Sequence, residues 1–307
     1  VCRDSLEKNT TASYNTAVGH QSLEANTTGT RNTAVGAYAL HANTTASDND
    51  AFGAYALGAV VTGTRNSAFG RSALQENTGD DNIAMGHEAL KVNTTGSKNA
   101  AFAPYALDAN TTGASNIALG YQALTSNTTG NYNIAIGDQA LYTQTTGGTD
   151  NVAIGRYSQY YAATATYNVS VGNNSLTNNS AGDFNVAVGH EALNDNTTGY
   201  YNAAVGAYAL DTNTTGNNNT AVGYHALGNN TTASHNTAMG YDALVNTTAS
   251  YNSGFGREAL KSNTTGSLNT AVGNRSLYTN STGNYNTACG DHSLNGNTTG
   301  DKSTAVG

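Results

Sequence analysis

Apolar residues recur along this chain every 17 residues, always in the same local pattern. One unit reads N-T-A-V-G-Y-Q-A-L-x-x-N-T-T-G-x-Y, and its positions are numbered 1 to 17 from the first Asn. Position 4 is always apolar, position 9 is Leu in nearly every copy, and positions 3 and 8 are almost always Ala, Ser or Gly. About eighteen units follow one another over residues 1–307, so the repeat defines the architecture.

The residue types at these positions predict β-strands. Val, Ile, Thr and Phe at positions 2 and 4 favour a strand, in which alternation puts both side chains on one face. We expect the Leu of position 9 to lie in a second short strand, after a bend at the Gly of position 5. Neither strand can bury its apolar face alone, so coil must stack on coil at about 4.8 Å. The prediction is an all-β parallel β-solenoid of about 18 coils of 17 residues.

Irregular units refine this prediction. The repeat shortens by one residue in 77–79 and just before Asn246, and it gains one at 147–148. All three changes fall between position 9 and the next position 1, so that stretch is predicted to be loop. In one unit Ala103, followed by Pro104, replaces the Gly of position 5. A residue before proline favours extended backbone, so we expect position 5 to be extended and its Gly to serve close packing rather than a positive φ.

Position 1 is Asn in nearly every unit, and stacked copies could pair side-chain amide with side-chain amide, as in cross-β ladders. This structural Asn ladder would contain Asn15, Asn32, Asn49, Asn66, Asn82, Asn99, Asn116, Asn133, Asn151, Asn168, Asn185, Asn202, Asn219, Asn236, Asn252, Asn269 and Asn286.

Composition narrows the class of protein. Only 10% of residues are charged, against about 25% in ordinary domains. A thinly spread net charge of −8 disfavours nucleic acid and anionic membranes as partners, and no apolar run is long enough to span a bilayer. Cys2 and Cys289 lie too far apart in the array to bridge within one chain, so they are either space-filling residues or contacts between chains. No spacing typical of a metal or cofactor site is present.

The pattern N-x-A-[VIF]-G-x-x-A-L, as in Asn133–Gly137, resembles the head repeats of trimeric autotransporter adhesins. It resembles still more closely the N-T-A-V-G-Y-x-A-L arrays of bacterial and phage tail-fibre-like surface proteins. The resemblance covers the whole chain and implies a parallel β-roll, association as a homotrimer and a place outside the cell. Adhesin heads have a shorter repeat, so the 17-residue coil is a departure.

Two features bear on self-association. The Ala columns of positions 3 and 8 offer a surface of small residues where another chain could pack, or they are Ala because space inside one narrow coil is short. Both alternatives stay open. Residues 1–307 read as one continuous array without a cap at either end. We therefore expect a segment of a longer fibre, or a subunit that stacks end to end.

Two groups of residues could carry surface chemistry. N-glycosylation sequons recur in the loop, although turn chemistry explains Asn-Thr-Thr-Gly equally well; they begin at Asn9, Asn26, Asn43, Asn93, Asn110, Asn127, Asn196, Asn213, Asn230, Asn246, Asn263, Asn280 and Asn297. Tyrosines near the bend could contact sugars or partner proteins, or simply favour a solvated β-face; they are Tyr38, Tyr55, Tyr105, Tyr121, Tyr157, Tyr160, Tyr161, Tyr208, Tyr224 and Tyr241.

The sequence predicts a structural and adhesive extracellular fibre rather than an enzyme. A glycosidase needs two carboxylates about 5–9 Å apart, and only Asp242 and Glu258 share position 7 in neighbouring coils. Only the coil at 157–166, where Gln159 replaces Leu, departs strongly from the consensus. A carbohydrate-binding or carbohydrate-cleaving tailspike is therefore the alternative. The Thr-Thr columns suggest ice binding as a further alternative, although neighbouring residues of an extended strand point to opposite faces and this stretch is predicted to be loop.

Overall fold

The computed structural model describes residues 3–307, so the prediction for Cys2 lies outside it. The chain forms two compact units, Val1–Asn151 and Val152–Gly307. The described residues contain no helix long and apolar enough to cross a membrane. Unit one holds β1 (Thr16–Val18), β2 (Thr33–Val35), β3 (Asp50–Phe52), β4 (Ser67–Phe69), β5 (Ile83–Met85), β6 (Ala100–Phe102), β7 (Ile117–Leu119) and β8 (Ile134–Ile136). Unit two holds β9 (Val152–Ile154), β10 (Val169–Val171), β11 (Val186–Val188), β12 (Ala203–Val205), β13 (Thr220–Val222), β14 (Thr237–Met239), β15 (Ser253–Phe255), β16 (Thr270–Val272), β17 (Thr287–Cys289) and β18 (Thr304–Val306).

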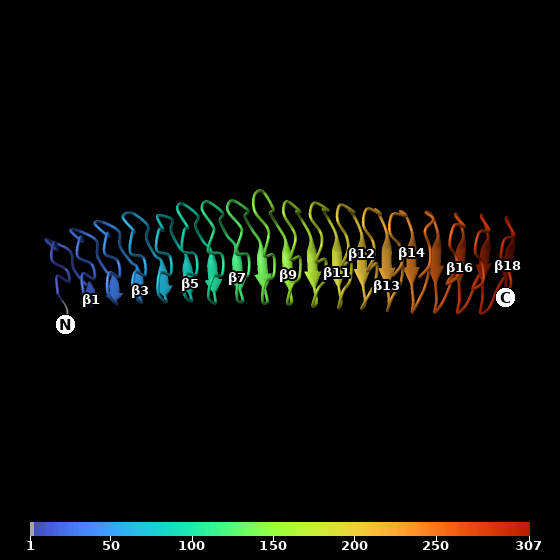
Figure 1. The fold of residues 1–307 in the computed structure, drawn as a ribbon, viewed down its shortest axis with the longest axis horizontal. Helices are drawn as coiled ribbons and strands as arrows, with labels where there is room; N and C mark the ends of the chain where they lie inside the picture. The colour runs from blue at the N-terminus through green and yellow to red at the C-terminus, as the bar shows by residue number, and fades with distance from the viewer. Residues whose placement is uncertain (1–2) are drawn as a thin grey trace. The chain divides into compact units, whose positions relative to one another are not determined.

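Each unit is a parallel β-solenoid, as predicted. Every coil contributes one strand at positions 2–4, and within each unit each strand pairs in parallel with the next one in the chain (Figure 1). Equal unit positions face one another, so Ala34 lies opposite Ala51. Where the repeat shortens, the strands still align: Ala68 lies opposite Ala84, and Ala238 opposite Gly254. The strand register is therefore kept, and the loop absorbs these changes in length.

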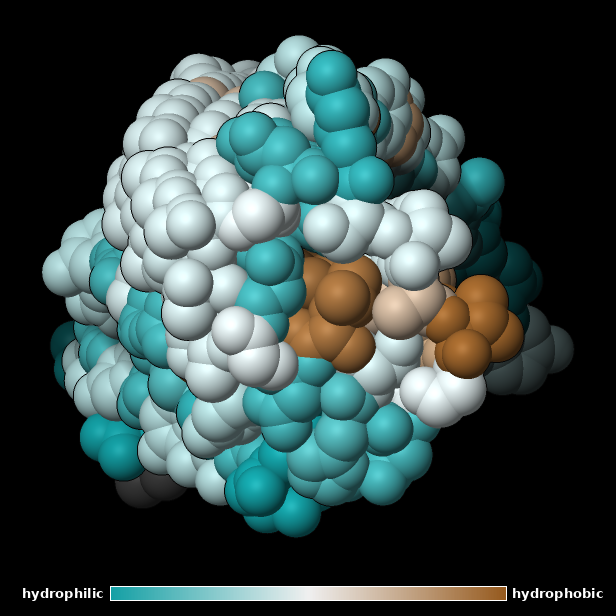
Figure 2. All heavy atoms as spheres, turned by 90° about the vertical axis from the view of Figure 1, so that its right-hand side faces the viewer, coloured by the Kyte–Doolittle hydropathy of each residue, from teal (hydrophilic) through white to brown (hydrophobic). Residues whose placement is uncertain are grey.

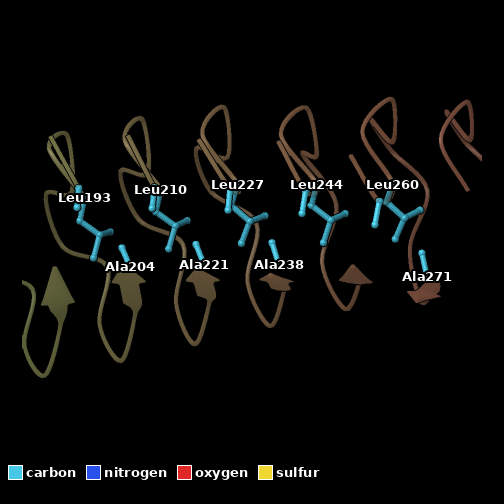
Figure 3. Close-up of a cluster of buried hydrophobic side chains, with 14 of the residues drawn as sticks. Leu193, Ala204, Leu210, Ala221, Leu227, Ala238, Leu244, Leu260 and Ala271 are labelled. Carbon is cyan, nitrogen blue, oxygen red and sulfur yellow. The ribbon is translucent and has the colours of Figure 1, made fainter. Parts of the chain in front are cut away.

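The interior of each coil is filled by position 3, position 8 and the Leu of position 9. In the second unit Leu193, Leu210 and Leu227 form one buried column, with Ala204 and Ala221 beside it (Figure 3). Viewed from the C-terminal side, hydrophobic residues lie at the centre of the coil section and also at one side of it, and more hydrophilic ones cover most of the remaining surface in this view (Figure 2). Except in the first and last strands, where Ala17 and Ala305 are partly buried, the Ala residues of these columns are buried and offer no surface to another chain. This favours the alternative that Ala is used because space is short.

The prediction of a second strand at position 9 is wrong. Leu40 and Leu227 lie in turns with φ of 51° and 53°, in the left-handed region. The chain curls there because a 17-residue coil must close tightly and still point Leu inward. The turn is bonded from coil to coil without being extended, since the Leu40 N–H donates to the Ala56 carbonyl at 3.0 Å.

The glycines of position 5 do two things, of which only one was predicted. They pack closely, because a Cβ on Gly36 would lie 2.5 Å from the Gly53 carbonyl oxygen in the next coil. The expectation that they avoid positive φ is wrong, since φ is 140° at Gly36 and even Ala103 has φ of 129°. The chain turns away from the strand at this point, and only this backbone conformation brings position 6 back over the coil. Ala103 therefore holds a conformation that L-residues rarely adopt.

Replacing Ala103 by Gly should stabilise the fold. The left-handed strain at Ala103 costs on the order of 1–3 kcal/mol and exceeds the backbone entropy that Gly loses, about 0.5–1 kcal/mol. We expect Ala103→Gly to raise the free energy of unfolding by about 1 kcal/mol in urea titrations. Ala101→Gly, in strand β6 with no positive φ, should lower it. An unchanged or lower stability of Ala103→Gly would contradict the strain argument.

Candidate functional site

The Asn residues of position 1 lie inside the coil, where they hold the turns together. Sixteen of the seventeen are buried, and Asn15 is partly buried. At Asn116, Nδ2 donates to the Gly130 carbonyl at 2.8 Å and to the Asn99 side-chain oxygen at 3.2 Å. Its Oδ1 in turn accepts the backbone N–H of Asn133 at 3.0 Å. Each amide therefore bonds to the coils on both sides and satisfies loop carbonyls that water cannot reach.

A second buried Asn column, at position 12, was not recognised from the sequence. Asn110 Nδ2 donates to the Asn93 side-chain oxygen at 2.6 Å and to the Gly113 carbonyl at 2.9 Å. The regularity of Asn-Thr-Thr-Gly was a signal for this column, but turn chemistry explained it equally well. Other residues occupy the position in a few coils, namely Val60, Gln144, Ala162 and Thr247.

The second column bears directly on the sequons. Ten of the thirteen acceptor Asn side chains are fully buried, with no room for a glycan in the folded chain. Asn9 and Asn246 are exposed, and Asn297 is partly exposed. Asn246 is exposed because the missing residue in its coil places Thr247 in the ladder, where Thr247 Oγ1 accepts from Asn263 Nδ2 at 3.2 Å. Glycosylation stays a hypothesis, which burial disfavours at ten of these positions.

Several of the predicted contact tyrosines are brought together in rows. In unit two the rings of Tyr224 and Tyr241 are stacked with centroids 5.4 Å apart, and Tyr208 meets Tyr224 edge-on at 5.7 Å. The guanidinium group of Arg257 lies over the Tyr241 ring, 6.0 Å from its centroid. The ring faces thus contact one another, while Tyr224 and Tyr241 remain about half exposed. The row presents ring edges and hydroxyl groups rather than open stacking platforms.

The remaining predicted tyrosines form smaller groups. Tyr38 and Tyr55 are stacked with centroids 4.9 Å apart, and Tyr105 meets Tyr121 edge-on. In the irregular coil Tyr160 packs edge-on against both of its tyrosine neighbours, Tyr157 and Tyr161. Gln159 of that coil points into the core, where it donates to Ser170 at 2.8 Å and to the Val152 carbonyl at 3.0 Å. The fold therefore satisfies Nε2 of this buried Gln, whereas its Oε1 is buried without a hydrogen-bond partner among the described residues.

Asp242 and Glu258, the two carboxylates considered for glycoside hydrolysis, both form ion pairs. Lys261 Nζ lies 2.9 Å from Asp242 and 2.8 Å from Glu258. Hydrogen bonds from Lys261 and Arg275 lower the pKa of Glu258 to about 2, so this side chain is ionised at neutral pH and cannot serve as a general acid. Among the described residues no group of three His, Cys, Asp or Glu side chains could hold a metal ion.

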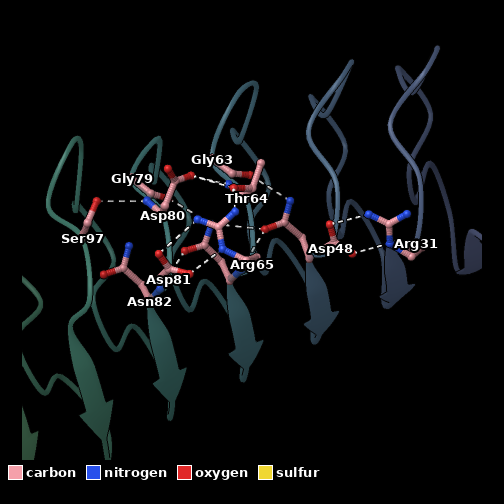
Figure 4. Close-up of polar contacts among 12 residues, drawn as sticks. Arg31, Asp48, Gly63, Thr64, Arg65, Gly79, Asp80, Asp81, Asn82 and Ser97 are labelled. Atoms are coloured by element: carbon pink, nitrogen blue, oxygen red, sulfur yellow. Dashed lines mark hydrogen bonds and ion pairs between the residues drawn. The ribbon is translucent and has the colours of Figure 1, made fainter.

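Position 17, two residues before each strand, carries side chains that the sequence interpretation did not single out. In unit one opposite charges alternate from coil to coil: Arg31 pairs with Asp48 through two hydrogen bonds, and Arg65 pairs with Asp81 in the same way (Figure 4). The hydrogen bond from Arg31 lowers the pKa of Asp48. In unit two the same position stacks aromatic rings, with Phe184 between Tyr167 and Tyr201.

The outward strand face, defined as the side chains of positions 2 and 4, is the largest apolar surface that the sequence interpretation missed. Position 3 points inward, so the bulky residues on either side of it point to solvent. In β7 Ile117 and Leu119 are 41% and 47% exposed, and in β11 Val186 and Val188 are 38% and 36% exposed. Asp50 is the only charged residue at these positions in all eighteen strands. Sequence did place both positions on one face, but it did not show that this face is outside.

Loss of one buried amide should weaken the unit measurably. Asn202→Ala removes the bond to the Gly216 carbonyl and the acceptor for the Asn219 N–H, and leaves both groups buried without these partners. We expect the free energy of unfolding to fall by about 1–3 kcal/mol for each such group. Asn173→Ala changes an exposed Asn in the same unit and should have little effect. Equal thermal stability of the two variants would refute the structural role of the ladder.

Asp211 should make stability pH-dependent. Burial, reinforced by Asp195 and Glu191, raises its pKa from 3.8 to about 6. The folded state then binds the proton more tightly than the unfolded state does, so the free energy of unfolding falls as pH rises from about 4 to about 6. Asp211→Asn should flatten this part of the profile and leave the protein more stable than wild type at pH 7. Thermal melts across the range test this, and parallel profiles would rule it out.

Comparison of the chain with protein-family models, curated proteins and solved structures finds no match.

Proposed function

We propose that this chain is a non-enzymatic structural protein of extracellular fibres, which assembles with copies of itself through the outward strand face. That the chain is a β-solenoid repeat protein follows from the parallel coils described above. One observation carries the proposal of self-association: in strand after strand bulky apolar side chains point to solvent on either side of a small residue that points inward.

Exposure on this scale is unusual for a surface with no partner. Single exposed apolar residues are normal, but contiguous apolar patches on soluble proteins mark sites of interaction. In unit one the outward positions of β5 to β8 hold only Ile, Met, Ala, Phe and Leu. In unit two those of β9 to β12 hold only Val, Ile and Ala. If a partner covered these columns, each Å² of apolar surface removed from water would stabilise the complex by about 25 cal/mol.

A second copy of the chain fits this face better than an unrelated partner does. The face repeats its columns at the spacing of the coils, and only another solenoid with the same coil spacing can match every row. Identical surfaces that associate in closed symmetry are the commonest arrangement of soluble oligomers. In this arrangement the chains touch through positions 2 and 4, and not through the buried Ala columns considered from the sequence. The chains would then associate side by side rather than end to end.

Carbohydrate binding is a second candidate function, favoured by the row of Tyr208, Tyr224 and Tyr241. Phenol hydroxyls and ring edges suit contacts with polar, hydroxyl-rich ligands. The row lies at positions 6 and 7, separate from the outward strand face, so a fibre could assemble by one surface and adhere by the other. We therefore include a location outside the cell in the proposal, for the fibre and for carbohydrate binding alike.

A charge on the outward strand face should oppose self-association. Val186→Lys in β11 would bury an unpaired ammonium group between copies, and we expect the association constant to fall at least about tenfold, or about 1.4 kcal/mol. Asn173→Lys, exposed at position 6, is the matched control and should associate like wild type. Analytical ultracentrifugation over a concentration series measures both. A wild-type chain that stays monomeric, or a Val186→Lys variant that associates normally, would overturn the proposal.

A further inference from the structure

A second regular surface lies in the loop half of the coil, at positions 13 and 14. This surface is called the threonine edge here, and Thr197-Thr198, Thr214-Thr215 and Thr231-Thr232 form its part in three successive coils. Apart from Val61 and a few Ala or Ser residues, every residue at these positions is Thr. No coil places a charged or aromatic residue there. The edge is therefore more uniform than any other exposed part of the unit.

Backbone and side-chain hydrogen bonds link the threonine edge from coil to coil. The backbone N–H and the hydroxyl of Thr197 both donate to the Thr214 carbonyl, each at 2.9 Å, and Thr214 donates in the same way to Thr231, at 2.8 Å and 3.0 Å. The N–H of Thr198 also reaches the Thr214 carbonyl, at 3.2 Å. The loops of Thr197 and Thr214 are thus each tied to the next coil, whereas among the described residues Thr231 and Thr232 make no such bond to the shortened coil that follows. The side chains of the three loops repeat at about 4.8 Å.

The two columns of the edge point their hydroxyl groups differently. At position 13 the hydroxyls of Thr197 and Thr214 are used within the protein, whereas no such bond comes from the Thr231 hydroxyl in the described part of the chain. Thr198, Thr215 and Thr232, at position 14, are exposed, and their hydroxyls make no hydrogen bond within the described part of the chain. Over these three coils position 14 therefore offers water a column of hydroxyl and methyl groups. The column begins after Ala181 and ends at the shortened coil, where Thr248 and Ala249 leave no residue at position 14. The expectation that neighbouring Thr residues diverge does not weaken this column, because only one of each pair is needed.

We propose that the threonine edge binds the surface of ice. Oxygen atoms repeat in ice along straight rows, with a period close to the spacing of stacked coils, so the hydroxyls of successive coils can enter one row. The neighbouring methyl groups leave no tightly held hydration shell, and no charged side chain at these positions organises water differently. Each contact is weak, but many contacts on a rigid scaffold act together and lose little entropy on binding.

The proposal is independent of self-association, because the threonine edge and the outward strand face use different positions of the coil. Two lysine variants within one coil separate the surfaces. Thr215→Lys places a long charged side chain in the middle of the edge. Asn218→Lys adds the same charge three residues later, at position 17, where Lys98 and Lys302 already occur with a similar backbone conformation. Both variants should melt like wild type, and a circular dichroism melt confirms that they fold.

The test is the partitioning of the purified chain into slowly growing ice, together with inhibition of ice recrystallisation. We expect wild type and Asn218→Lys to enter the ice and inhibit recrystallisation, and Thr215→Lys to lose most of both effects. A triple change of Thr198, Thr215 and Thr232 to Lys should abolish them. Exclusion of wild type from the ice would overturn the proposal, as would normal activity of the triple variant in its folded form. Binding to a crystalline polysaccharide such as cellulose without any effect on ice would also overturn it.

Discussion

The constraint on which the rest of the structure depends is the narrow interior of a 17-residue coil. Each coil has room inside for one Leu, two small residues and the amides of two Asn residues, as in the coils of Leu210 and Leu227. Loop carbonyls turned inward cannot reach water, so they need buried donors, and the Asn side chains supply them. A core of this size cannot also take the Val, Ile or Phe of position 4. These side chains go outside, and that is why the surface carries the bulkiest apolar residues.

The same narrowness sets the backbone path. Positions 7, 9 and 17 take the left-handed conformation in nearly every described coil, although they hold Tyr, Leu or Asp rather than Gly. Such a residue costs on the order of 1–2 kcal/mol, and a chain that repeats it so often must recover the cost elsewhere. It does so through backbone hydrogen bonds to both neighbouring coils and through the burial of Leu at the tightest turn. Stability is thus a property of stacked coils, and one coil alone would not hold this path.

Sequence alone could predict the period, the strand at positions 2–4 and the loop that absorbs changes in length, because the spacing of Asn, Gly and apolar residues indicates each of them. The second strand expected at position 9 is absent from the described coils. Sequence could not tell inside from outside. Alternation puts Ile117 and Leu119 on one face and Ala118 on the other, and the usual expectation buries the larger pair. Only the coil's small cross-section reverses this choice, and that is a tertiary constraint. The left-handed Leu residues escaped prediction for the same reason, since no local propensity favours them.

Stacking like on like also limits what a solenoid can display. Identical charges about 4.8 Å apart would repel one another along a whole column. A column of charged residues must therefore alternate in sign, or the column must consist of uncharged residues. Position 17 of the first unit alternates, through Arg31, Asp48, Arg65 and Asp81. Most other columns carry few charges, which accounts for a total of only 10%. Long uncharged columns are therefore the natural surface of this fold, apolar on the strands and hydroxyl-bearing on the loops. A partner that exploits them must repeat at the same spacing, and another solenoid or a crystal lattice is the kind of object that does.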